Sequence, residues 1–107
     1  MTHDALDARS LALHRLIAQK IEHDPALLHR AADNLAHWKT LESRNSQPYI
    51  LAWEALLAQG LAACLRMAIE DSDHAKAMRQ CSPFAGVLSP QERWKFLRDW
   101  GMQHDSK

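Results

Sequence analysis

The chain is poor in the residues that mark disulfide scaffolds and nucleotide-binding loops: its 107 residues include two cysteines, three glycines and four prolines. Cys64 and Cys81 are too few for a disulfide framework and lack CxxC spacing, so we expect two reduced thiols. Three glycines leave no glycine-rich phosphate loop. No segment alternates polar and apolar residues for long, which argues against a β-sheet.

Neither sign of charge is in excess. Thirteen basic residues balance thirteen acidic ones, so no whole-molecule field attracts the chain to nucleic acid or anionic lipid. The most apolar window, residues 51–69, is interrupted by Glu54, Gln59 and Arg66, and the first ten residues contain no apolar signal-peptide segment. These absences predict a cytoplasmic protein that makes no membrane contact.

What is present is the composition of an ordinary globular domain, with 47% hydrophobic and 24% charged residues. Apolar residues recur at spacings of three and four, so we predict an all-α fold of about six helices in a single compact domain over residues 1–107. Residues 43–47 form a polar linker between helices. Residues 82–88 form an apolar loop between the last two helices.

Two helices are predicted in the first half of the chain. The first covers residues 5–23, and Asp24 and Pro25 then begin the second as N-cap and first-turn proline. The apolar stripe of the first helix is Leu6, Leu13, Leu16, Ile17 and Ile21, and that of the second is Leu28, Ala32, Leu35, Trp38 and Leu41.

A third helix is predicted from Pro48, with Tyr49, Ile50, Trp53 and Leu57 on its buried face. We expect it to break near Gly60; the alternative is one continuous helix to Ile69, since the apolar residues keep helical phase across the glycine.

The last two predicted helices have clear start signals. A short helix covers residues 73–80, after the capping residues of "EDSD". The last helix opens with "SPQE", in which Ser89 and Glu92 fit a capping box around Pro90, and Gly101 is expected to end it.

No constellation of residues indicates a catalytic, cofactor or metal site. His14, His23, His29, His37 and His74 offer no i,i+4 pair, so surface or helix-end positions are expected for them. His74 and Cys81 would be ~10.5 Å apart along one helix, too far for a nucleophile and its base. Hydrolase and P-loop motifs are missing, and we therefore predict that the chain is not an enzyme.

Tryptophans and basic residues are the more informative features. Trp38 and Trp53 fall on apolar stripes and are expected in the core, whereas the last helix carries more apolar area than one packing face needs, so an aromatic edge there should be exposed. Basic residues gather in the same region: Lys76, Arg79, Arg93, Lys95 and Arg98. A small DNA-binding regulator is therefore the alternative function, although the seven-residue turn is longer than in helix-turn-helix proteins.

The apolar loop "SPFAGVL" has two interpretations. Pro83 and Gly86 can shape a compact turn that sends Phe84 and Leu88 inward, pinning the last two helices together. Alternatively the whole loop is a docking surface. In the first interpretation, which we favour, partners bind at an exposed rim beside the loop, formed by Val87, Arg93, Lys95, Arg98 and Trp100.

The block "RQCSPFAGVLSPQERW", residues 79–94, resembles a family of small bacterial helical proteins, and the resemblance extends over most of the chain. Members of that family are associated with toxin-antitoxin-like gene neighbourhoods. The resemblance implies a protein-binding module, the antitoxin-like partner of a toxin. It implies no catalytic residues. A second copy of the chain is a further candidate partner.

Overall fold

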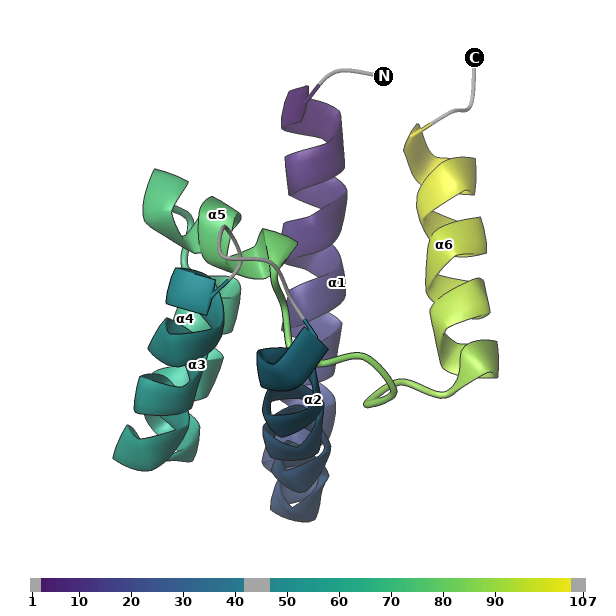
Figure 1. Ribbon diagram of the computed structural model, residues 1–107. Helices are drawn as coiled ribbons and strands as arrows, with labels where there is room; N and C mark the ends of the chain where they lie inside the picture. Colours follow the sequence, from purple (N-terminus) through teal and green to yellow (C-terminus); the bar gives the residue numbers. More distant parts are fainter. Residues whose placement is uncertain (1–2, 42–46, 105–107) are drawn as a thin grey trace.

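The computed structural model describes residues 3–41 and 47–104, which form six α-helices, one 3-10 turn and no strand. The predicted all-α fold is therefore confirmed. The predicted linker at 43–47 lies outside the described residues, except for Gln47. The elements in order are α1 (His3–His23), the turn η1 (Pro25–Leu27), α2 (Leu28–Leu41), α3 (Gln47–Gln59), α4 (Leu61–Ile69), α5 (Asp73–Gln80) and α6 (Pro90–His104) (Figure 1).

Five helices share one core, and the sixth stands at its side. α4 packs on α1, α3 and α5, and α2 packs on α3. α6 runs antiparallel to α1, on the side away from α3 and α4 (Figure 1). Each of the five helices contributes buried apolar side chains, and the loop before α6 contributes more; among those at most 3% exposed are Ile21, Leu35, Ile50, Trp53, Met78, Phe84 and Val87.

The apolar stripes are mostly as predicted, with three exceptions. Leu6 is exposed because the 21 residues of α1 extend beyond the nine-residue α4 on which α1 packs. Leu41 is 67% exposed as the last residue of α2. Within α2, Ala31 is buried and Ala32 exposed; both positions satisfy helical spacing from Leu28, and packing alone decides between them.

Most predicted helix ends are confirmed. Gly60 separates α3 from α4 with φ +123°, a conformation that favours glycine. Ser72 begins α5 by accepting a hydrogen bond from the amide of Ala75 at 3.1 Å. Ser89 begins α6 in the same way, through the predicted capping box.

Two predicted helix ends are wrong. Asp24 makes no side-chain cap; the chain forms the η1 turn there, in which the backbone carbonyl of Asp24 accepts the amide of Leu27 at 3.0 Å. α6 continues past Gly101 to His104, because this glycine does not take the left-handed conformation that ends helices and is tolerated inside one at a cost of about 1 kcal/mol. No helix in the described part of the chain has both the length and the hydropathy needed to cross a bilayer.

Candidate interaction surface on the last helix

The loop between α5 and α6 is part of the core. Pro83, Phe84, Val87 and Leu88 are all buried. The ring of Phe84 is 3% exposed and meets the ring of Trp53 edge to face, with 5.4 Å between centroids. Removing such a side chain from water stabilises a fold by about 1.5–3 kcal/mol. The prediction that Phe84 and Leu88 face inward is confirmed.

Two details of the predicted loop are wrong. Phe84 does not pin α5 to α6, since its ring neighbours are Trp53 of α3 and His14 of α1. Val87 does not belong to an exposed rim, because its side chain is 1% exposed. The turn explains the burial of both side chains. Gly86 takes φ +87°, and the amide of Val87 donates to the carbonyl of Phe84 at 3.1 Å. The chain therefore reverses direction here, and the side chains of Phe84 and Val87 both enter the core.

Polar side chains from α1 and α2 hold this loop in place. Asn34 of α2 donates through Nδ2 to the carbonyls of Pro83 and Ala85, both at 2.8 Å. On α1, the Nε2 of His14 lies 2.8 Å from the hydroxyl of Ser82. Buried loop backbone needs such partners. Neither residue could be found from the sequence, because nothing near Asn34 or His14 along the chain indicates a partner so distant.

His14 is buried, at 4% exposure, instead of lying at the surface or a helix end as predicted. Its Nδ1 lies 2.7 Å from the carbonyl of Ser10, so Nδ1 carries the proton and Nε2 accepts the hydroxyl proton of Ser82. Burial lowers the pKa of His14, and the nearby charge of Arg79 adds to this effect. A neutral imidazole beside a hydroxyl can activate a nucleophile, but here it is enclosed by the core and anchors the loop.

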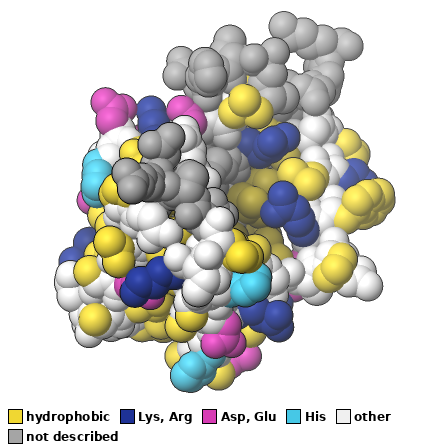
Figure 2. Space-filling model, viewed as in Figure 1, with side chains coloured by type: hydrophobic (Ala, Val, Ile, Leu, Met, Phe, Trp, Pro, Cys, Tyr) yellow, Lys and Arg dark blue, Asp and Glu magenta, His cyan; other side chains and the backbone are white. Residues whose placement is uncertain are grey.

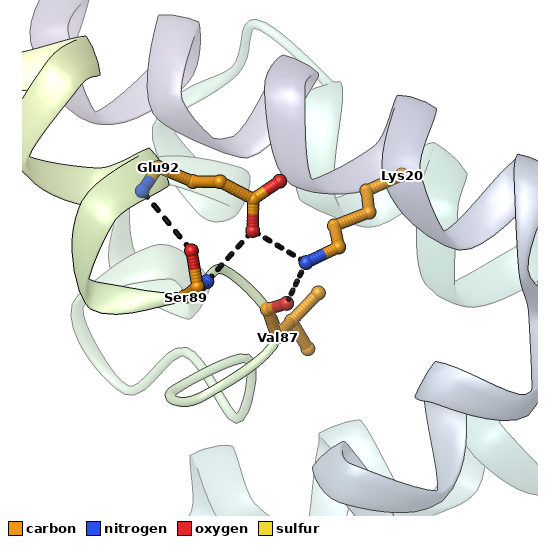
Figure 3. A network of polar contacts seen from close by, with 4 residues as sticks. All are labelled: Lys20, Val87, Ser89 and Glu92. Carbon is orange, nitrogen blue, oxygen red and sulfur yellow. Dashed lines mark hydrogen bonds and ion pairs between the residues drawn. The ribbon is translucent and has the colours of Figure 1, made fainter.

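A clamp of four residues fixes the start of α6 (Figure 3). Lys20 of α1 donates through Nζ to the carbonyl of Val87, at 2.9 Å, and to the carboxylate of Glu92. Glu92 also accepts the amide of Ser89 at 2.8 Å, and the hydroxyl of Ser89 accepts the amide of Glu92 at 3.1 Å. The hydrogen bond from Lys20, together with that from Ser89, lowers the pKa of Glu92 to about 2. The first turn of α6 is therefore attached to α1 through Lys20.

Beyond that turn, none of the α6 side chains that the structure describes is buried. Trp94 is 62% exposed. The guanidinium carbon of Arg98 lies 4.7 Å from the centroid of the Trp94 ring, which is a cation–π contact. Met102 is also exposed, one helical turn further. We call Trp94, Arg98 and Met102 the outer ridge. The predicted exposed aromatic edge is found here; Figure 2 shows hydrophobic and basic side chains gathered over α6.

A groove of about 590 Å³ separates α6 from α1. The rings of Phe96 and Trp100 stack along its α6 side, with 6.0 Å between centroids and 24° between planes. Among the described residues, the groove is lined by Ala12 and Leu16 of α1 and by Glu92, Lys95, Phe96, Asp99, Trp100 and Gln103 of α6. We call this surface the groove; it has an apolar floor and charged edges.

The predicted interface residues on α6 lie on different sides of the helix. Arg93 and Lys95 are exposed, whereas Trp100 is half-buried in the groove. Lys95 forms an ion pair with Asp99 at 2.7 Å, and its hydrogen bond lowers the pKa of that carboxyl. Trp94 was missing from the predicted set, although its spacing of four from Arg98 was a usable signal.

Arg79 is the member of the predicted cluster of five basic residues that does not lie at the surface. Its side chain is buried and donates through Nη1 to the carbonyls of Ala68, at 3.2 Å, and Glu70, at 2.7 Å. These carbonyls belong to the end of α4, where they lack helical partners. Burial lowers the pKa of Arg79. Its guanidinium therefore supports the fold and does not belong to an exposed basic patch.

Among the side chains that the structure describes, no three His, Cys, Asp or Glu residues come together as a metal site. Comparison of the chain with known protein families, curated proteins and solved structures finds no match. The exposed surfaces of α6 are therefore the candidate functional features of the described chain.

Proposed function

We propose that this chain is a non-enzymatic protein-binding module whose docking surface is the outer ridge of α6. The observation that carries the proposal is Trp94, 62% exposed beneath Arg98 on a helix with no buried side chain in its described part. Tryptophan and arginine are the residues most enriched where protein interfaces concentrate their binding energy. An exposed tryptophan already ordered by an arginine loses little side-chain entropy on binding.

The way α6 is mounted supports a preformed docking surface. Its base is fixed by the clamp of Lys20 and Glu92, and by the buried loop that precedes it. A helix fixed at one end, with Trp94 and Met102 exposed, presents these ridge side chains in a defined geometry. Binding then requires no rearrangement of the core.

In this proposal the chain is the antitoxin-like partner of a bacterial toxin. The support is the resemblance of residues 79–94, together with the position of that block in the fold. Its middle part is the buried loop, and its last residues, Arg93 and Trp94, are exposed on α6. The block thus contains both the support of the docking surface and its first anchor.

The experiment is co-purification of the tagged protein from its native cells, followed by affinity measurements with the identified partner. Trp94→Ala and Arg98→Ala are each expected to weaken binding by about 30-fold or more, as truncated hot-spot residues do. Leu51→Ala is the matched control, because Leu51 is an exposed apolar residue on α3.

Salt dependence separates the proposal from nucleic-acid binding. Affinity at the outer ridge should change little with salt, whereas phosphate contacts weaken steeply as salt rises. A partner held equally well by the Trp94→Ala and Leu51→Ala variants would refute the assignment of the ridge. Recovery of DNA with a steep salt dependence would favour the regulator instead.

A further inference from the structure

We propose that the groove between α1 and α6 is filled by α6 of a second copy of this chain, so that the protein is a symmetric homodimer. The groove is distinct from the outer ridge. Its α6 residues lie at 92, 95, 96, 99, 100 and 103, whereas the ridge residues lie at 94, 98 and 102. The proposal therefore goes beyond the proposed function and is tested separately from it.

The groove has the surface that helix packing requires. Its α6 residues recur at spacings of three and four, the pattern of a helix face that packs along another helix. The stacked rings of Phe96 and Trp100 supply the apolar centre, and Ala12 on α1 is small enough for close approach. Because the clamp at Lys20 and Glu92 fixes the base of α6, the groove exists before anything binds.

The charges on the groove edge match a second copy of the same helix. Lys95 and Asp99 lie on this edge, and Leu97 is midway between them in the sequence. Within one copy Lys95 pairs with Asp99 at 2.7 Å. When two α6 helices pair antiparallel with the two-fold axis at the level of Leu97, Lys95 of each copy also faces Asp99 of the other. A two-fold interface demands such reciprocity, because each copy presents the same surface.

The whole molecule also favours self-association over repulsion. Its formal net charge is zero, so two copies approach without a long-range electrostatic barrier. In the paired state, α1 and α6 of both copies form a four-helix arrangement that buries the apolar floor of the groove. The exposed outer ridge remains available to another protein.

The first test measures the mass of the full chain by sedimentation equilibrium. We expect a dimer for the natural sequence, and a loss of dimer affinity of at least about 30-fold for Phe96→Glu, which places a charge at the apolar centre. Leu51→Glu places the same charge at an exposed apolar site on α3 and should leave the dimer intact. Equal effects of the two variants, or a monomeric natural chain up to about 100 μM, would overturn the proposal.

The second test uses the exposed charges, whose exchange leaves the core untouched. Lys95→Glu leaves acidic side chains at both positions 95 and 99, and Asp99→Lys leaves basic side chains at both. Each variant alone should be monomeric because like charges face each other, and an equimolar mixture should form heterodimers that native mass spectrometry detects. Homodimers of both variants as tight as those of the natural chain would contradict the antiparallel pairing. None of these outcomes bears on the outer ridge, which the Trp94 and Arg98 variants test.

Discussion

Removing the ring of Phe84 tests whether the loop before α6 is a structural part of the core. The Phe84→Ala change deletes a ring that is 3% exposed. That ring contacts Trp53 edge to face, at 5.4 Å between centroids, and His14 at 6.0 Å. The loop is held by Asn34, which donates to its carbonyls, and by His14, which accepts the hydroxyl of Ser82, so it cannot easily collapse into the space left behind.

The expected loss follows from the removed contacts. Truncation of a buried phenylalanine to alanine costs about 3–5 kcal/mol, because the transfer free energy is lost and a cavity remains. The edge-to-face contact with Trp53 accounts for about 0.5–1.5 kcal/mol of this. A domain of this size is stable by about 5–15 kcal/mol, so the variant loses a large part of its stability. The melting temperature should fall by roughly 12–20 °C.

The assay is urea unfolding followed by far-ultraviolet circular dichroism. Trp94→Ala is the control, since it removes a larger aromatic ring from the exposed ridge and should cost less than about 1 kcal/mol. Phe84→Leu keeps most of the apolar volume and gives an intermediate loss that can be measured even if the alanine variant fails to fold. Should Phe84→Ala cost no more than Trp94→Ala, the loop does not belong to the core and the reasoning fails.

Three further predictions concern ionisable groups and thiols. The free energy of unfolding should decline as the pH drops below about 6.5, because His14 takes up a proton there in the unfolded chain, whereas burial lowers its pKa in the folded protein. Urea unfolding at neutral and acidic pH should therefore show a smaller difference in this free energy for the His14→Gln variant. A carbon-13 NMR titration should place the pKa of Glu92 at about 2 in the natural chain. In the Lys20→Met variant the pKa of Glu92 should move toward the ordinary value of 4.5. The same Glu92 pKa in both proteins would show that the clamp does not form in solution. Reducing agent should leave the melting temperature unchanged, because both cysteines are free thiols. A pulse of iodoacetamide should label Cys81 before Cys64, because burial raises the pKa of the Cys64 thiol to about 11. Labelling of Cys64 first, detected by mass spectrometry, would contradict this prediction.

The sequence by itself determined the local features of this protein. The helix starts at Ser72 and Ser89 depend on side chains that bond amides three residues away, so short sequence windows contain all the necessary information. The break at Gly60 is equally local, because glycine tolerates the φ of +123° found there. The inward direction of Phe84 followed from the cost of leaving a compact apolar loop in water.

Only the tertiary structure decided which surfaces are covered. His14 and Arg79 look like ordinary surface residues in the sequence, yet both are buried, because hydrogen-bond partners on other segments satisfy them. Val87 enters the core through a turn closed by its backbone hydrogen bond to Phe84, and the spacing of apolar residues in the sequence does not indicate that turn. Conversely, α6 has the aromatic residues of a core helix but keeps Trp94 exposed. Burial depends on contacts between residues far apart in the chain, and a local pattern of apolar spacing cannot say whether a neighbour is present to cover it.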